Sequence, residues 1–406
     1  MNNSKEDFRI LFVTKYISGC LPGDFAYHGE WTSTYELILS LKKLNDNIQI
    51  YLITPKVREE HASRFQEEFG GTLAKIGVLH VFADTYLDFS LSPALFRWRV
   101  FLKEKEIIRK FGISVIQYGQ FGLCYTCRFK RILGLKKIIC YGCYDAGQDW
   151  PGKSEDRLYK KSLFSKSTTI TRIQSFLLKI FTRIVRLKVF DKRIDHFVLR
   201  NPLGYQQLIK EHPSLNIDLI PKGQSNPIVV LPREGKIPKS ILFLGHLQYR
   251  KGILDLLKIA EQMSDMDFNI VGSGDANIEA MICEYASKLS NVNYSGPVNY
   301  NEKWQVYQRN DILLHPSYKD TFPSAILEAL SYGLPVITTD EIDSPISNGR
   351  DGFLFQAGNL DQLVEKLNAL RANPVLYHKM SKAALQTAKK YTWDNAAKQF
   401  LKLYFQ

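Results

Sequence analysis

KDTFPSAILEALSYGLPVITT, residues 319–339, is the stretch that decides the fold. It starts as a polar loop, continues as an apolar helical run that ends at Gly333, and closes on the β-branched run PVITT. Two acids, Asp320 and Glu328, stand eight positions apart around the expected helix start. A loop that leads into a helix exposes backbone N–H groups at the positive end of the helix dipole. Such a place binds phosphate, and the Ser324 hydroxyl can assist there.

The two acids flank this expected phosphate site, an arrangement that suits the hydroxyls and diphosphate of a nucleotide-sugar. The stretch resembles the signature of two acids separated by seven residues in the retaining glycosyltransferases of family 4, which have the GT-B fold. The resemblance implies that Asp320, a glutamate in the family, contacts the transferred sugar and that Glu328 binds the ribose. It places four more residues around the donor phosphates: Phe322, Pro323, Ser324 and Ala325. The alternative interpretation, which needs no family resemblance, is that Asp320 is an ordinary loop carboxylate beside the start of a helix.

A second motif, GHLQYRKG at 245–252, follows an expected strand and opens a helix. It resembles the family's glycine–arginine–leucine loop, in which the arginine and a lysine five residues later bind the donor diphosphate. The resemblance implies that Gly245 lies at the substrate and that Lys251 acts as a catalytic cation. His246 replaces the arginine and lacks the fixed charge and planar fork of a guanidinium, so Arg250 is expected to compensate. The alternative is a glycine turn with basic residues on the surface.

Two further turns in the C-terminal half are expected to line the nucleotide pocket. Gly272 and Gly274 in VGSGD (271–275) would let a base or ribose approach the backbone. Alone, this G-x-G equally suits a dinucleotide-binding fold. Val298, in the segment YSGPV, resembles the family position whose backbone meets the nucleobase, and the alternative is an ordinary strand end.

In the N-terminal half the resemblance is looser. Gly29 stands where the family has a glycine-rich loop before the first helix, so it is expected to approach donor or acceptor. YGCYDAG (141–147) is similar to a subgroup that builds bacterial surface polysaccharides, and Asp145 matches an acid of that subgroup. The histidine that many members carry before glycine is missing here, which argues against a histidine-assisted mechanism.

Alternating strand and helix patterns predict an α/β protein with two Rossmann-like domains and parallel sheets. A stretch rich in Pro, Gly and charge at 221–239 is typical of a linker. We therefore expect an acceptor-side domain at 1–225 and a nucleotide-sugar-binding domain at 226–390. The resemblance adds that the sheets face each other across a cleft and that a helix at 391–406 crosses back to the first domain. The alternative is that this helix stays on its own domain.

The composition is that of an ordinary globular protein, with 45% hydrophobic and 23% charged residues among 406. No apolar run is long enough to span a membrane, and the N-terminus lacks the pattern of a signal peptide, so we expect a cytoplasmic protein.

The basic charge is unevenly distributed. Residues 1–225 hold 35 Lys and Arg against 22 Asp and Glu, which accounts for the whole net charge of +13. The imbalance favours a polyanionic partner such as membrane headgroups or an anionic acceptor, and we do not expect nucleic acid. Within 153–195, an amphipathic pattern at 168–190 could lie on the inner face of the membrane or pack on the sheet. Its basic face comprises Arg172, Lys179, Arg183 and Arg186.

Four cysteines form two C-x-x-C pairs with twelve residues between them: Cys124, Cys127, Cys140 and Cys143. This spacing could hold zinc. The surrounding sequence favours structural thiols instead, because the first pair would start a helix and Cys140 would lie in a buried strand.

Together with these patterns, the resemblance implies a retaining, metal-independent glycosyltransferase without a cofactor. It would move a sugar from a nucleotide diphosphate-sugar to a glycan or lipid-linked acceptor in the assembly of capsule, O-antigen or exopolysaccharide. No Asp-x-Asp pair follows a strand to hold a metal ion, so Lys251, Arg250 and the helix start at 323–326 would stabilise the leaving group. One alternative is a catalytically silent GT-B-like binding protein, suggested by the unusual Asp320 and His246. A nucleotide-dependent oxidoreductase would need an acid after the next strand, and NVNYSG has none.

Overall fold

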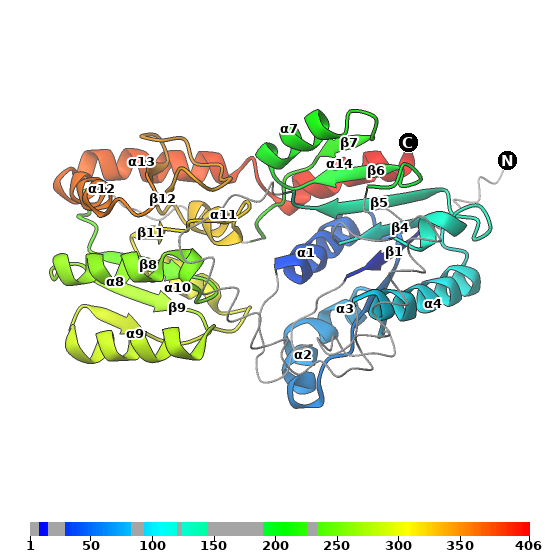
Figure 1. The fold of residues 1–406 in the computed structure, drawn as a ribbon, viewed down its shortest axis with the longest axis horizontal. Helices are drawn as coiled ribbons and strands as arrows, with labels where there is room; N and C mark the ends of the chain where they lie inside the picture. Colours follow the sequence, from blue (N-terminus) through cyan, green and yellow to red (C-terminus); the bar gives the residue numbers. More distant parts are fainter. Residues whose placement is uncertain (1–7, 15–28, 83–92, 120–123, 145–189, 226–233) are drawn as a thin grey trace. The chain divides into compact units, whose positions relative to one another are not determined.

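The computed structural model describes residues 8–14, 29–82, 93–119, 124–144, 190–225 and 234–406 (Figure 1). The chain divides into two compact units. The N-terminal unit comprises 1–144, 158–221 and 393–406, and the C-terminal unit comprises 145–157 and 222–392. The boundary therefore lies after Pro221, a few residues before the position expected from the linker composition. Each unit holds a parallel sheet, which confirms the predicted fold class of two α/β domains.

The N-terminal unit is built on a seven-stranded parallel sheet with the order β3-β2-β1-β4-β5-β6-β7. The strands are β1 (Arg9–Val13), β2 (Gln49–Thr54), β3 (Leu79–Phe82), β4 (Val115–Tyr118), β5 (Lys137–Gly142), β6 (His196–Leu199) and β7 (Ile217–Leu219). The register pairs Ile10 with both Ile50 and Val115. The strand order reverses between β1 and β4, and ligands bind at the carboxyl ends of strands at such a point in open parallel sheets.

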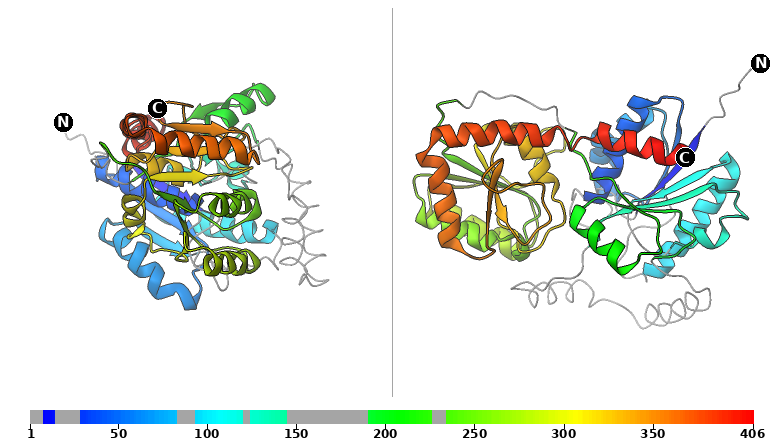
Figure 2. Two further views of the ribbon diagram at one scale, coloured as in Figure 1. Left: turned by 90° about the vertical axis from the view of Figure 1, so that its left-hand side faces the viewer. Right: turned by 90° about the horizontal axis from the view of Figure 1, so that it is seen from above.

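The described helices of this unit are α1 (Gly29–Leu44), α2 (Ala62–Phe65), α3 (Gly71–Lys75), α4 (Pro93–Phe111), α7 (Pro202–Glu211) and α14 (Trp393–Phe405). The last of them, α14, is the C-terminal helix of the chain and packs against α1 (Figure 2). Its Phe400 ring meets Tyr141 of β5 edge-on at 4.8 Å, and Tyr404 donates a hydrogen bond to Gln117 of β4. These buried aromatic contacts anchor residues 393–405 in the N-terminal unit.

The C-terminal unit has a six-stranded parallel sheet with the order β10-β9-β8-β11-β12-β13. Its strands are β8 (Ser240–Leu244), β9 (Asp267–Val271), β10 (Val292–Tyr294), β11 (Ile312–His315), β12 (Val336–Thr339) and β13 (Gly352–Phe355). Its helices are α8 (Ile253–Gln262), α9 (Ala276–Lys288), α10 (Lys303–Arg309), α11 (Ser324–Ser331), α12 (Leu360–Ala372) and α13 (Pro374–Ala388). Here the strand order reverses between β8 and β11.

Helices cover both faces of this second sheet (Figures 1 and 2). Alternate strand residues point to opposite faces. Ile241 and Phe243 accordingly join the cluster formed with α8, α9 and α12. Leu242, between them, joins the cluster formed with α10, α11 and α13. A sheet buried on both faces explains the nearly continuous apolar strands in the sequence. Among the described residues, no helix is long and apolar enough to cross a membrane.

Candidate functional site

Two loops at the carboxyl ends of β8 and β11 form the candidate site. These strands are neighbours at the point where the strand order of the sheet reverses. The carbonyl oxygen of Arg250 accepts hydrogen bonds from the Tyr318 N–H at 2.9 Å and from the Ser317 hydroxyl at 3.1 Å. Gly252 makes the close approach possible, because its φ is 74° and a Cβ there would collide with the carbonyl oxygen of Pro316. The loops 245–252 and 316–320 are therefore fixed against each other.

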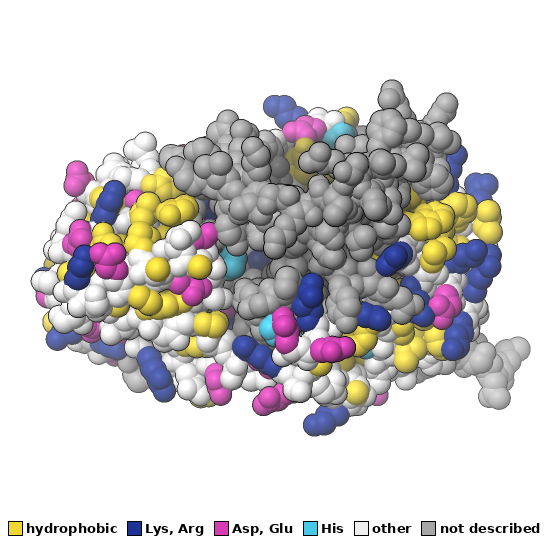
Figure 3. All heavy atoms as spheres, turned by 60° about the horizontal axis from the view of Figure 1, so that its bottom comes forward, with side chains coloured by type: hydrophobic (Ala, Val, Ile, Leu, Met, Phe, Trp, Pro, Cys, Tyr) yellow, Lys and Arg dark blue, Asp and Glu magenta, His cyan; other side chains and the backbone are white. Residues whose placement is uncertain are grey.

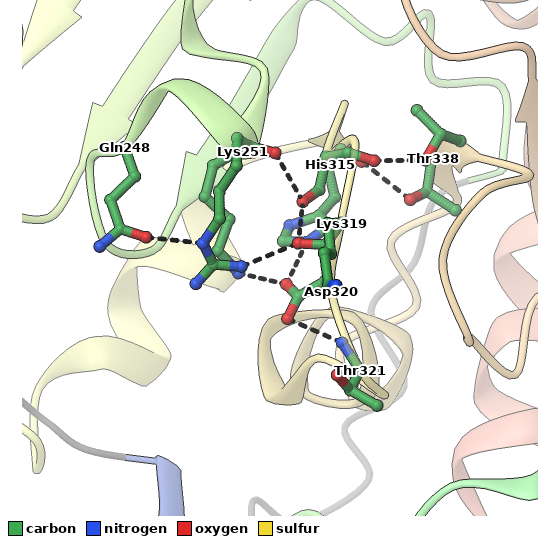
Figure 4. Close-up of polar contacts among 10 residues, drawn as sticks. Gln248, Lys251, His315, Lys319, Asp320, Thr321 and Thr338 are labelled. Atoms are coloured by element: carbon green, nitrogen blue, oxygen red, sulfur yellow. Dashed lines mark hydrogen bonds and ion pairs between the residues drawn. The ribbon is translucent and has the colours of Figure 1, made fainter. Parts of the chain in front are cut away.

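Asp320 lies at the centre of this arrangement (Figure 4). Its Oδ2 forms an ion pair with Lys251 Nζ and a hydrogen bond with His315 Nε2 at 2.9 Å. Its Oδ1 accepts the N–H of Thr321 at 3.0 Å. The Lys251 and Asp320 side chains are only 12% and 15% exposed, so water screens the pair weakly. The structure thus brings together two of the three residues expected to be catalytic and adds a histidine.

Burial and charge set the protonation of this cluster. Burial alone would raise the pKa of Asp320, but Lys251 and His315 outweigh it and hold that pKa well below its ordinary value. Burial lowers the pKa of His315, and the hydrogen bond with Asp320 opposes this shift. Both pKa shifts are consistent with a neutral His315 ring whose Nε2–H donates a hydrogen bond to the Asp320 carboxylate. The neutral ring also fits the buried Nδ1 atom, which has no hydrogen-bond partner among the described residues.

The two other basic residues of the first loop make different contacts. Arg250 donates from Nε to Gln248 Oε1 and from Nη1 to the carbonyl of Lys319, each at 2.8 Å. Its guanidinium therefore lies beside Asp320 without forming an ion pair with it among the described contacts. His246 is exposed, and its Nδ1 lies 2.7 Å from the carbonyl oxygen of Ser273. This contact requires the proton on Nδ1, so the Nδ1–H of His246 is engaged by the protein's own backbone.

Helix α11 begins beside Asp320, as the sequence predicts. Pro323 precedes it in extended conformation and, having no polar side chain, leaves the helix without a side-chain cap. Ser324 and Ala325 form its partly exposed first turn, where unpaired N–H groups favour an anion. Phe322 differs from expectation, because its ring is fully buried and packs on Tyr391, so only its backbone can meet a ligand. Its φ of 52° is the one positive value of a non-glycine residue in the described chain.

Glu328 lies on the same helix but is already engaged by two side chains of α10. Lys303 Nζ is 2.5 Å from its Oε1, and the Tyr307 hydroxyl donates to its Oε2 at 2.6 Å. Almost every residue of α11 is buried, so a carboxylate there needs such partners. A ribose would therefore share Glu328 with Lys303 and Tyr307.

The glycines of the nucleotide turn approach the protein's own backbone. A Cβ at Gly272 would collide with the carbonyl oxygen of Gly245, and one at Gly274 with that of Leu247. The loops after β8 and β9 thus also need these glycines for their mutual contact, and the expected approach of a base or ribose stays a prediction. Val298 lies four residues beyond β10 and packs on the apolar cluster formed with α11, and its expected contact with a nucleobase stays a prediction.

The expected N-terminal residues are only partly described. Gly29 is the first residue of α1, and Asp145 lies outside the described residues. Cys124, Cys127 and Cys140 are buried and Cys143 is exposed. The helix expected at the first C-x-x-C pair is one 3-10 turn, Thr126–Phe129, with Cys127 Sγ donating to the Cys124 carbonyl. Within the described ranges, no group of three or more His, Cys, Asp or Glu side chains is placed to hold a metal ion.

Sequence reasoning missed three residues of this site: His315, Lys303 and Tyr307. His315 carried a signal, because it ends a predicted strand next to the motif stretch and so reaches the same sheet edge as Asp320. Lys303 and Tyr307 carried none, since only the fold brings α10 against α11.

The C-terminal unit matches a known family. Residues 232–387 fit the family model described as glycosyl transferases group 1. The chain is 29% identical over 171 residues to N,N'-diacetylbacillosaminyl-diphospho-undecaprenol alpha-1,3-N-acetylgalactosaminyltransferase of Campylobacter jejuni, which covers 40% of this chain and 44% of that protein. It is 30% identical over 171 residues to an uncharacterized glycosyltransferase of Haemophilus influenzae, covering 39% and 47%. The chain thus spans less than half the length of each of these relatives.

Solved structures agree over nearly the whole chain. The lipopolysaccharide outer core galactosyltransferase WaaB, in its apo form, superposes with a TM-score of 0.63 at 18% identity and covers 98% of this chain and 99% of that one. HepE of Anabaena in complex with UDP-glucose superposes with a TM-score of 0.66 at 12% identity, covering 97% and 98%. These likenesses establish the fold. The chain therefore has the GT-B fold, and its residues 232–387 match the model of glycosyl transferases group 1.

Proposed function

We propose that this chain is a retaining, metal-independent glycosyltransferase that moves a sugar from a nucleotide diphosphate-sugar to a glycan or lipid-linked acceptor. The observation that carries the proposal is the Lys251–Asp320–His315 cluster beside the uncapped start of α11. Retention is supported by the two acids with seven residues between them, Asp320 and Glu328.

The cluster suggests how a donor is held. A diphosphate at the first turn of α11 would face its N–H groups, with Lys251 and Arg250 on the neighbouring loop. Negative charge grows on the diphosphate as the bond to the sugar breaks, so these groups stabilise the transition state more than the bound donor. Asp320 keeps its orientation through His315 and Thr321, and its carboxylate can accept a hydrogen bond from a sugar hydroxyl.

The acceptor and pathway are supported by the relatives. The Campylobacter protein is named for an undecaprenol diphosphate-linked acceptor, and WaaB acts in the lipopolysaccharide outer core. A lipid-linked glycan in surface polysaccharide assembly is accordingly the acceptor that we propose.

The proposed donor site predicts nucleotide binding that depends on Glu328. In a thermal-shift screen with UDP, GDP, ADP and TDP, one of them should stabilise the protein by about 2.7 kcal/mol at 100 times its Kd. Glu328→Gln should raise that Kd about tenfold, because a neutral amide accepts the ribose hydroxyls more weakly than a carboxylate. Glu302→Gln, an exposed acid beside Lys303, should change it less than twofold.

Two outcomes would revise the proposal. Equal nucleotide affinities of wild type and Glu328→Gln would remove the ribose role of Glu328. Nucleotide binding without release of the nucleoside diphosphate from any of the sugar donors tested would favour a catalytically silent binding protein. The Lys251–Asp320 ion pair is compatible with this alternative, because each charge already neutralises the other.

A lipid-linked acceptor also predicts peripheral attachment to an anionic membrane. On the face drawn in Figure 3, Lys and Arg side chains are interspersed with Asp and Glu. The amphipathic basic pattern at 168–190 lies outside the described residues, and it is this part of the sequence that favours an anionic surface. Co-sedimentation with anionic liposomes at 0.1 M salt should be lost at 1 M, because the Debye length falls from ~10 Å to ~3 Å. Changing Arg172, Lys179, Arg183 and Arg186 together to Gln should weaken it. Equal binding to neutral liposomes would contradict an electrostatic attachment.

A further inference from the structure

Arg200 of the N-terminal unit is a buried cation at the carboxyl edge of the seven-stranded sheet. It directly follows β6 and is only 5% exposed. Its Nη2 donates hydrogen bonds to the carbonyl oxygens of Gly119 at 2.6 Å and of Tyr141 at 3.1 Å. Its Cζ lies 4.3 Å from the centre of the Tyr141 ring. The guanidinium therefore reaches across the ends of β4, β5 and β6.

This cation has no negative partner within the described chain. No carboxylate of the described residues lies within ion-pairing distance of Arg200, whereas Arg193 in the same unit pairs with Asp191 at 2.5 Å. The Nε of Arg200 is buried and makes no hydrogen bond there, and the same holds for the hydroxyl of Tyr141. A buried charge and two buried donors without acceptors cost several kcal/mol together, so a fold that keeps them usually satisfies them in another way.

Arg200 lies close to the point where the strand order of the sheet reverses. Gly119 follows β4, one of the two strands between which the order of the sheet reverses. A Cβ at Gly119 would lie 3.1 Å from Glu30 Oε1 and from Thr34 Oγ1, so the first turn of α1 adjoins the same edge. Glu30 is the acid that faces this edge from α1, and it forms no ion pair with Arg200. Ligands of open parallel sheets bind at this edge.

We propose that Arg200, together with the hydroxyl of Tyr141, binds a phosphate group of the acceptor. The inference rests on the proposed function, because it assigns the acceptor-side contact of that reaction. A phosphate offers several acceptor oxygens, which match the planar fork of a guanidinium and leave one for a phenol. The whole net charge of +13 lies within residues 1–225, which favours an anionic ligand on this unit. In the proposed function, the diphosphate of the donor would instead bind near Lys251, which belongs to the other unit.

The test measures binding of inorganic pyrophosphate to the full chain with the donor site saturated by the nucleoside diphosphate found above. Arg200→Gln should raise the Kd for pyrophosphate at least about tenfold, as expected for the loss of a charge-assisted hydrogen bond. Arg200→Lys keeps the charge but not the fork, so it should lose less. Arg193→Gln, the matched arginine that already has a partner, should stay within twofold of wild type. The Kd of the nucleotide should be unchanged in all three.

Hydrogen exchange of the wild-type protein tests the assignment even if the variants fail to fold. Pyrophosphate should slow hydrogen exchange in peptides that contain Gly119 and Tyr141. Farnesyl diphosphate distinguishes the two sources of phosphate. Binding at least tenfold tighter than pyrophosphate would identify a lipid-linked acceptor, and equal binding a soluble phosphorylated one. Pyrophosphate binding that is equal in wild type and Arg200→Gln, or wild-type exchange that pyrophosphate leaves unchanged, would overturn the assignment. Failure of nucleotides to bind would instead count against the proposed function.

Discussion

Replacing Lys251 with methionine is expected to lower turnover at saturating donor by about two to three orders of magnitude. Methionine keeps the length and packing of the aliphatic chain but removes the charge that would stabilise the departing diphosphate. Lys251 is mostly buried, so water cannot substitute for the lost cation. Because the charge matters most in the transition state, turnover should fall more than donor affinity. Release of nucleoside diphosphate under single-turnover conditions measures both quantities.

Two companion variants separate charge from packing in this experiment. Lys258→Met removes an exposed lysine from α8, seven residues further along, and should leave turnover within twofold. His315→Gln retains a hydrogen-bond donor toward Asp320 and removes the ring, so it should lower turnover about tenfold or less. An effect of Lys251→Met below threefold would show that Lys251 serves only to pair Asp320, and the leaving-group role would pass to Arg250.

The cluster around Asp320 also shows which parts of a site the sequence can predict. Lys251 and Asp320 were both expected at the donor because their two motifs resemble motifs of one family. The structure adds the physical reason, since their loops follow neighbouring strands, whose carboxyl ends share an edge of the sheet. The start of α11 was predicted for a similarly local reason, a proline and a serine before an apolar run. Short motifs were sufficient to find these residues, since each motif is a continuous stretch of sequence around a strand end or a helix start.

Other features depend on contacts that have no local pattern. Lys303 and Tyr307 bind Glu328 only because α10 packs beside α11, which is a property of the sheet order. The glycines of VGSGD were interpreted as space for a ligand, although their neighbour is the backbone of the loop after β8. The role of Arg200 could not be predicted from the sequence for the same reason, because only the fold buries this side chain and leaves it without a carboxylate partner among the described residues.

Gly252→Ala is expected to damage the site through the backbone. Alanine at a φ of 74° costs about 1–2 kcal/mol in any protein. Here its Cβ would also meet the carbonyl oxygen of Pro316, which the neighbouring loop fixes, so one loop must move. We expect a loss of about 3 kcal/mol or more in the free energy of unfolding, and roughly 6–12 °C in the Tm of a unit of this size. Calorimetry of the full chain measures it.

Gly235→Ala is the matched control, because its φ of 69° carries the same left-handed cost while a Cβ there meets nothing within 4 Å. Gly235→Ala should lower the free energy of unfolding by about 1 kcal/mol and keep the wild-type nucleotide affinity. The difference between the two variants then isolates the contact between the loops after β8 and β11. Because Lys251 immediately precedes Gly252, displacement of this loop also separates Lys251 from Asp320, so Gly252→Ala should lose nucleotide affinity as well as stability. Equal losses of unfolding free energy in the two alanine variants would mean that the loops can shift to accommodate a methyl group. Their close approach would then not be what holds Lys251 in place.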